Sequence, residues 1–217
     1  MRQYESYRCN KCGNVVEVSH VGGGTLSCCG EDMEMVTENL TLVNLLKAFA
    51  GESQARNKYE YFAKVAQKEG LRDIADHFQR AANNEKQHAK LELALHNVMI
   101  EGNPFGDTVE NLKAAIAGES YENLTMYPDF AAIAKEEGHK EAAQLFKLIG
   151  KIEVEHENMF KALVERLESG NEFISEDGEE EWICEVCGHV HRGKKPPKAC
   201  PVCKHPQEYF SRQNSRK

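Results

Sequence analysis

The chain has 217 residues, a formal net charge of −8 at pH 7 and eight cysteines. This length allows one large domain, or one medium-sized domain with small attachments. The acidic balance, without a basic stripe, disfavours a nucleic-acid partner. The sequence has no run of about 18 apolar residues, so we expect no membrane-spanning helix. The first residues lack the apolar stretch of a secretory signal, so we expect a cytoplasmic protein with reduced thiols.

The cysteines form two groups of four near the two ends of the sequence. They are Cys9, Cys12, Cys28 and Cys29, and then Cys184, Cys187, Cys200 and Cys203. In a reducing compartment such clusters indicate bound metal rather than disulfides. We therefore predict a first cysteine domain at 1–38, a helical domain at 39–172 and a second cysteine domain at 173–217.

The first 38 residues are expected to form short strands and turns. So short a segment cannot bury a sizeable core and needs a cross-link, such as a bound metal ion, to hold it together. Cys28 and Cys29 are adjacent in this segment. Neighbouring thiols are compatible with a buried pair, with a strained vicinal disulfide, or with two ligands of one metal ion.

The middle of the chain shows apolar residues at helical spacing, which predicts helices at about 41–69, 71–100, 107–136 and 139–169. Gly70 and Gly138 are placed to end the first and third of them, because glycine readily adopts the left-handed conformation of a helix end. EGNPFGD at 101–107 separates the two pairs of helices. SEDGEEE at 175–181 is predicted to be a solvated linker.

The helical part repeats itself. AFAGES at 48–53 matches AIAGES at 115–120, and FAKVAQKEG at 62–70 matches FAAIAKEEG at 130–138. The interval between the two motifs is one residue longer in the second copy, and after the shared glycine the register holds. A duplicated helical hairpin, packed as a four-helix bundle, is the simplest interpretation.

The repeat places carboxylates and histidines at matching positions. The first and third predicted helices supply Glu52 and Glu119, and the second and fourth supply the pairs Glu85–His88 and Glu153–His156. This is the ligand set of di-iron carboxylate bundles. A single ExxH pair is usually a solvated pair on a helix surface. Two pairs at the same offset in a repeat favour a two-metal site, whose cations compensate the charge of four buried carboxylates.

Glu122 breaks the symmetry of the repeat, because its counterpart in the first copy is Ala55. It lies about one turn from Glu119, so the second copy brings an extra carboxylate to the site. An extra oxygen ligand facing a histidine could let one iron change its ligand with oxidation state, since carboxylate suits ferric iron and imidazole suits ferrous iron.

The helical part resembles the rubrerythrin family in GESQARNKYEYFA, NNEKQHA, AGESYEN and MYPDFA. The resemblance implies a mainly α fold, a ferritin-like bundle with two irons per chain. The implied ligands of the oxidised form are Glu52, Glu85, Glu119, Glu122, Glu153 and His156. On reduction, His88 is implied to replace Glu122 on one iron.

Tyr59 and Tyr127 match the tyrosines that hydrogen-bond to ligand carboxylates in rubrerythrins. Without that resemblance, a tyrosine on a bundle helix is more often a core residue.

CEVC at 184–187 and CPVC at 200–203 are two knuckles typical of a four-thiolate metal site. Zinc and iron both accept that geometry, and a zinc ribbon is the more common structure in an arbitrary protein. WICEVCG and CPVC resemble the rubredoxin-like domain of rubrerythrins, which implies iron, with Trp182 and Phe210 packed around it. The first module resembles desulforedoxin and implies a second mononuclear iron held by four cysteines. The three-part chain thus resembles the desulforubrerythrins.

The resemblance implies a peroxidase that reduces hydrogen peroxide at a diferrous centre, with Glu122 as a candidate proton donor. NADH or NADPH electrons would arrive through a separate reductase and the rubredoxin-like iron, because no GxGxxG motif follows a strand here. A head-to-tail homo-oligomer, a dimer or tetramer, is implied. The alternatives are iron storage in a ferritin-like shell, oxygen reduction at the same centre, and a zinc-ribbon interaction module.

Overall fold

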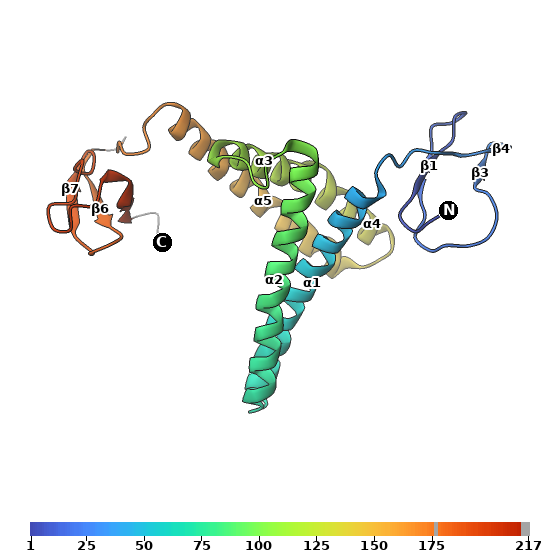
Figure 1. Cartoon of the computed structure of the whole chain (residues 1–217), viewed down its shortest axis with the longest axis horizontal. Helices are drawn as coiled ribbons and strands as arrows, with labels where there is room; N and C mark the ends of the chain where they lie inside the picture. Colours follow the sequence, from blue (N-terminus) through green and yellow to red (C-terminus); the bar gives the residue numbers. More distant parts are fainter. Residues whose placement is uncertain (176–177, 214–217) are drawn as a thin grey trace. The chain divides into compact units, whose positions relative to one another are not determined.

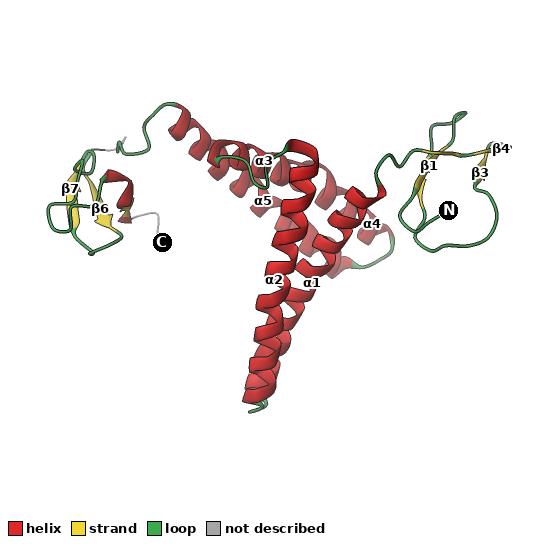
Figure 2. Cartoon of the chain, in the orientation of Figure 1, coloured by secondary structure: helices red, strands yellow, loops and turns green. Residues whose placement is uncertain are grey.

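The computed structural model describes residues 1–175 and 178–213. Within these residues the chain is mainly helical, and strands occur only in the two cysteine modules (Figure 2). The chain divides into two compact units, Met1–Phe105 and Gly106–Lys217, and each unit joins one cysteine module to one helical hairpin (Figure 1). No helix in the described part of the chain is both long and apolar enough to cross a bilayer.

The N-terminal module is built from five very short strands. They are β1 (Ser6–Arg8), β2 (Val15–Glu17), β3 (Ser27–Cys28), β4 (Glu31–Asp32) and β5 (Glu34–Met35). The antiparallel sheet has the order β2-β1-β5, and β3 and β4 form a separate hairpin. Only Glu5, Cys9, Val18 and Met33 are buried in this module. So small a core cannot hold the fold alone, as the sequence predicted.

The first helical hairpin consists of α1 (Leu40–Lys68) and α2 (Arg72–Glu101), each within one residue of its predicted bounds. The side chain of Asn39 caps α1 by accepting hydrogen bonds from the backbone of its first turn. Gly70 follows α1 with a φ of +80°, as expected for a helix end. The buried residues of the two helices are all alanines, namely Ala63, Ala66, Ala75, Ala82 and Ala89.

The second hairpin contains a feature that the sequence did not predict. The segment predicted as one helix at 107–136 consists of α3 (Thr108–Tyr121), the π-helix η1 (Glu122–Met126) and α4 (Tyr127–Glu136). The N–H of Tyr127 donates to the carbonyl of Glu122, five residues earlier instead of four. This single wide turn takes up the extra residue of the second repeat. The hairpin is completed by α5 (Lys140–Glu168).

The π turn restores the match between the two repeats. In the first hairpin the rings of Tyr59 and Phe78 lie 6.1 Å apart at 39°. In the second hairpin the rings of Tyr127 and Phe146 lie 6.2 Å apart at 35°. The two copies therefore share the same packing beyond the insertion.

The C-terminal module is a three-stranded antiparallel sheet of order β7-β6-β8, with a 3-10 turn, η2 (Gln207–Tyr209), before β8. The strands are β6 (Glu180–Cys184), β7 (Val190–Gly193) and β8 (Phe210–Arg212). The predicted linker at 175–181 is therefore wrong at its end, because Glu180 and Glu181 belong to β6. Residues 176–177 of that prediction lie outside the described residues.

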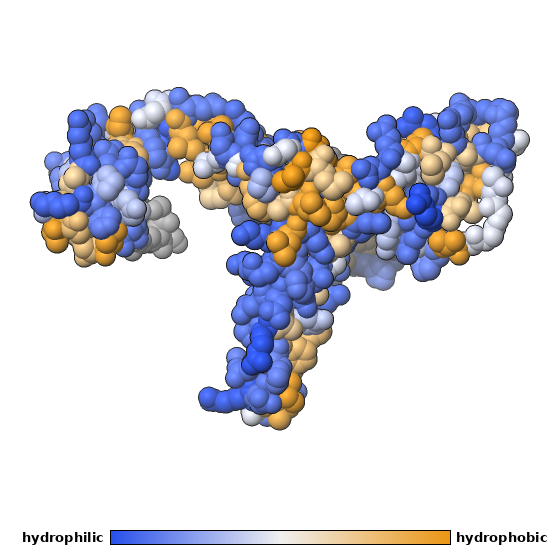
Figure 3. Space-filling view, viewed as in Figure 1, coloured by the Kyte–Doolittle hydropathy of each residue, from blue (hydrophilic) through white to orange (hydrophobic). Residues whose placement is uncertain are grey.

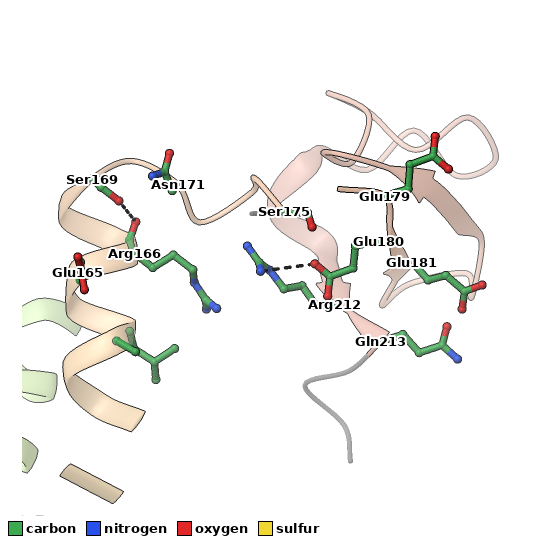
Figure 4. Close-up of a pocket in the computed structure, with 12 residues that line it drawn as sticks. Glu165, Arg166, Ser169, Asn171, Ser175, Glu179, Glu180, Glu181, Arg212 and Gln213 are labelled. Atoms are coloured by element: carbon green, nitrogen blue, oxygen red, sulfur yellow. Dashed lines mark hydrogen bonds and ion pairs between the residues drawn. The ribbon is translucent and has the colours of Figure 1, made fainter. Parts of the chain in front are cut away.

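Arg212 explains why an acidic stretch enters this sheet. Its guanidinium lies 3.4 Å from the carboxylate of Glu180, and both side chains are mostly buried (Figure 4). It also donates to the carbonyls of Glu172 and Ile174, and it lies over the ring of Trp182. Arg212 thus holds the segment after α5 against the sheet.

Both hairpins expose large apolar side chains, which form apolar areas on the visible surface (Figure 3). In the first hairpin these include Leu46, Phe62, Val65, Leu91 and Leu95; in the second they include Leu124, Phe130, Ile133, Leu148 and Ile152. Each hairpin buries little beyond alanine, so its large apolar residues call for a further packing surface.

Candidate metal centres

The first hairpin brings together Glu52 from α1 with Glu85 and His88 from α2. One ligand atom from each residue lies within 4.8 Å of the other two. Nδ1 of His88 is 2.7 Å from a carboxylate oxygen of Glu85 and 3.8 Å from one of Glu52. The three-residue spacing on α2 places Glu85 and His88 on one helical face, as the sequence predicted.

The second hairpin repeats this arrangement with Glu119 from α3 and with Glu153 and His156 from α5. Nδ1 of His156 is 2.7 Å from a carboxylate oxygen of Glu153 and 3.6 Å from one of Glu119. Each triad lies within its own compact unit. The repeat seen in the sequence is therefore also a repeat of geometry.

The two carboxylates of the first triad lie close together, and this affects the pKa of Glu52. The pKa of Glu52 is raised by a hydrogen bond with Glu85, by burial and by the charge of Glu85, while the charge of His88 opposes the rise. A divalent cation between the carboxylates would compensate their charge. Two carboxylates and an imidazole around one point are a donor set that suits iron.

Glu122 and Tyr127 belong to the surroundings of the second triad. Glu122 is the first residue of η1 and lies outside the three-residue cluster. Burial raises the pKa of Tyr127, and so do the charges of Glu122, Glu153 and Glu119. Within the described residues no hydrogen bond joins the hydroxyl of Tyr59 or Tyr127 to a carboxylate. That part of the sequence prediction stays a prediction.

One acidic residue near the first triad was missed by the sequence reasoning. Glu92 on α2 has a carboxylate oxygen that is buried without a hydrogen-bond partner. Its charge also contributes to the raised pKa of Glu52. The signal was available in the repeat, because the equivalent residue of the second copy is Phe160.

The four sulfur atoms of the N-terminal module lie within 4.8 Å of one another. Sγ of Cys28 is 3.6 Å from that of Cys12 and 3.8 Å from that of Cys29. A tetrahedral site with metal–sulfur bonds of about 2.3 Å has edges of about 3.8 Å. Cys29 has a φ of +54°, an uncommon backbone conformation that lets two adjacent side chains approach one centre. Cys28 and Cys29 are thus free thiols placed as ligands of one metal ion.

The four sulfur atoms of the C-terminal module are arranged in the same way, and two of the four cysteines are fully buried there. Sγ of Cys184 is 3.5 Å from Cys203, and Sγ of Cys187 is 3.6 Å from Cys200. Cys184 and Cys200 are fully buried in one cluster with Trp182 and Phe210. The predicted packing of these two aromatic side chains around the site is confirmed.

The thiols of both modules favour a bound cation. The backbone N–H of Cys12 holds the pKa of Cys9 at about 7. Burial raises the pKa of Cys200, but the backbone N–H groups of Cys203 and Val202 bring it to about 6. In contrast, the neighbouring sulfurs, Cys12 first, raise the pKa of Cys28 to about 12. A metal ion would compensate the charge of four neighbouring thiolates.

Comparison with known proteins assigns all three parts of the chain. The family models for rubrerythrin, for the desulfoferrodoxin N-terminal domain and for the rubrerythrin rubredoxin-like domain match residues 44–164, 1–36 and 182–211. A putative rubrerythrin of Methanocaldococcus jannaschii is 45% identical over 186 residues, covering 78% of this chain and 91% of the relative. A rubrerythrin of Porphyromonas gingivalis is 48% identical over 174 residues, covering 77% and 86%.

The N-terminal module has a separate relative. It is 61% identical over 36 residues to a desulfoferrodoxin of Nitratidesulfovibrio vulgaris, covering 17% of this chain and 29% of that protein. The domain boundaries predicted at 38 and 172 are not tested by these matches and stay predictions.

The predictions of fold class and cofactors are confirmed. Rubrerythrins have the ferritin-like fold and bind a di-iron centre together with a rubredoxin-like iron. The chain carries the carboxylate–histidine groups of the former and a four-cysteine group for a mononuclear iron in each terminal module. The rubrerythrin family model matches more than half of the chain, and the two rubrerythrin relatives named above match more than three quarters of it. This chain therefore belongs to the rubrerythrin family.

Proposed function

We propose that this protein is a peroxidase that reduces hydrogen peroxide to water at its di-iron centre. Rubrerythrins are oxidoreductases of oxidative-stress defence, and peroxide as the substrate of this chain is our proposal. The observation that supports it most directly is that one chain carries both a pair of equal Glu–Glu–His triads and a four-cysteine module of the rubredoxin-like type. An iron-storage protein would not need that module.

The proposed ligands of the oxidised di-iron centre are Glu52, Glu85, Glu119, Glu122, Glu153 and His156. His88 is proposed to replace Glu122 on one iron in the reduced state. Two features support this exchange. Glu122 lies in a π turn, a structure frequently found at functional sites. The side chain of His88 is about half exposed, so its ring has room to turn.

The bound iron pair would supply two electrons, one from each metal ion. The protein's own residues would manage protons. Glu122, when released from the metal, would hold a proton close to the second triad. Tyr127 would keep its hydroxyl proton to a higher pH than a solvated tyrosine, because burial and the nearby carboxylates raise its pKa. Its O–H is then available as a donor, and Tyr59 is proposed to take the same role in the first hairpin.

Electrons are proposed to come from a separate NAD(P)H-dependent reductase through the C-terminal four-cysteine iron. Cys187 is exposed although Cys184 and Cys200 are buried, which leaves one edge of the thiolate cluster accessible to a donor protein. The exposed apolar residues of both hairpins support a homo-oligomer, proposed as a head-to-tail dimer or tetramer. Free thiols that serve as metal ligands suit the reducing cytoplasm, where we place the protein.

The test is steady-state consumption of hydrogen peroxide by the iron-loaded protein with a reductase and NADH. We expect Glu122→Ala and Cys184→Ser to lower the rate by at least about tenfold. A chain truncated before Thr37 serves as a comparison that keeps the hairpins and the C-terminal module. Variants that consume peroxide as fast as the unmodified protein would refute the mechanism. A faster reaction with oxygen than with peroxide would instead identify an oxygen reductase.

A further inference from the structure

Glu92 lies on the same stripe of α2 as a proposed iron ligand. It follows Glu85 by seven residues and His88 by four. Seven residues are about two helical turns, so Phe78, Glu85 and Glu92 point in nearly the same direction. Helical side chains lean toward the N-terminus of their helix, which inclines the carboxylate of Glu92 toward the turn that bears His88.

The position of Glu92 can be compared with its equivalent in the second hairpin, where the residue is not an acid. The residues equivalent to Phe78, Glu85 and Glu92 are Phe146, Glu153 and Phe160. In that hairpin the central glutamate is flanked by aromatic residues on both sides of its stripe. In the first hairpin one of the two flanking residues is an acid.

The surroundings of Glu92 are unusual for a solvated surface acid. One carboxylate oxygen is buried without a hydrogen-bond partner, although the residue as a whole is partly exposed. A carboxylate between solvent and the interior, with an oxygen free to bind a proton, can pass protons from one to the other.

We propose that Glu92 relays protons from solvent to the first triad during peroxide reduction, an inference that rests on the proposed function. Each hydrogen peroxide that becomes two waters takes up two electrons, one from each ferrous iron, and two protons. Both protons come from solvent, and one of them passes through the carboxylate of Glu92, which takes it up on its solvent side and releases it toward the triad. In this proposal Glu92 serves the first triad in the way that Glu122 is proposed to serve the second.

The test uses three variants of the full-length, iron-loaded protein. Glu92→Gln removes the acid and keeps the shape, Glu92→Asp keeps the acid, and Glu101→Gln removes an exposed charge from the same helix. Iron content and the visible spectrum report on the metal sites. Stopped-flow oxidation of the fully reduced protein by hydrogen peroxide reports on the single turnover. Far-ultraviolet circular dichroism checks that each variant is folded.

We expect Glu92→Gln to keep its iron and its spectrum and to oxidise at least about tenfold more slowly. Glu92→Asp should recover to within about threefold of the unmodified rate, and Glu101→Gln should match it. A Gln variant at full speed, a Gln variant that loses iron, or an Asp variant as slow as Gln would overturn the relay. If the unmodified reduced protein does not react with peroxide, the proposed function fails instead.

Discussion

Nδ1 of His88 lies 2.7 Å from a carboxylate oxygen of Glu85, and His156 keeps the same distance to Glu153 in the other hairpin. Two equal pairs of this kind give no geometric reason for the two histidines to behave differently. The difference proposed for them must come from the residues around each pair, above all from Glu122, whose counterpart in the first repeat is the uncharged Ala55.

Replacing each histidine separately tests that difference. In the oxidised protein, His156→Gln should lose iron from the di-iron centre, because it removes a ligand present in that state. His88→Gln should keep its iron when oxidised and lose it on reduction. Iron per chain, measured by elemental analysis before and after anaerobic reduction, checks both. His77→Gln, on the exposed side of α2, is the control; equal losses in both variants would contradict the ligand exchange.

Deleting Leu124 should convert η1 into ordinary α-helix. Leu124 is 72% exposed in the π turn, and the deletion gives the second repeat the spacing of the first. We expect a free energy of unfolding within about 1 kcal/mol of the parent, because residues after the turn keep their contacts.

Deleting Tyr61, also exposed but within regular α1, is the matched comparison. It shifts the register of all residues that follow in the helix, so a loss of more than about 3 kcal/mol is expected. Urea unfolding followed by circular dichroism measures both deletions. Similar losses would show that the π turn does not absorb the extra residue.

Tyr127 should ionise at higher pH than a solvated tyrosine. Its pKa is raised by burial and by the charges of Glu122, Glu153 and Glu119. The folded form thus holds its proton more tightly than the unfolded form. The resulting stability is fully present below a pH of about 10, and it is lost as the pH rises through the pKa of the folded state.

The ultraviolet absorbance of phenolate in iron-free protein, with Tyr127→Phe as the reference, follows this ionisation. Glu122→Gln should lower the pKa of Tyr127, since it removes one of the negative charges. An unchanged titration curve in Glu122→Gln would place Glu122 too far from the tyrosine to act on it.

Arg212→Lys should loosen the C-terminal module although it keeps the charge. Lysine lacks the fork that reaches two carbonyls and a carboxylate at once. We expect a loss of about 2–4 kcal/mol, because Glu180 is mostly buried and would lose part of its pairing. The loss of visible absorption on heating reports on this module, and Arg192→Lys, an exposed ion pair of the same sheet, should change it little.

Local patterns that recur in the chain could be predicted from the sequence. The helices begin and end within a residue or two of their predicted bounds, since Gly70 and Gly138 fix their ends. The members of each triad, such as Glu52 with Glu85 and His88, were predicted because a three-residue spacing and an internal repeat can both be recognised in the sequence itself. The sulfur clusters were predicted because the cysteines fall into two groups of four that contain CxxC knuckles.

Features that depend on spatial partners could not be predicted in this way. The composition of ENLTM gives no sign of a π turn, and only the unequal repeat length pointed to one. Glu180 looked like part of a solvated acidic run until Arg212, 32 residues later in the sequence, was seen to pair with it. Glu92 looked like one of many surface acids, because the burial of a single oxygen cannot be read from the sequence, and the repeat shows only that Phe160 takes the equivalent position.

The wide turn at Glu122–Met126 has a consequence for how such a site could have evolved. A residue added to a regular helix rotates everything beyond it by about 100° and would turn each later side chain to a new neighbour. Because the added residue is confined to one turn, the side chains beyond that turn keep their orientation and their neighbours. A duplicated, symmetrical ancestor could in this way gain a residue next to Glu122 in one half only, so that its two halves became inequivalent while the residues beyond the turn kept their packing.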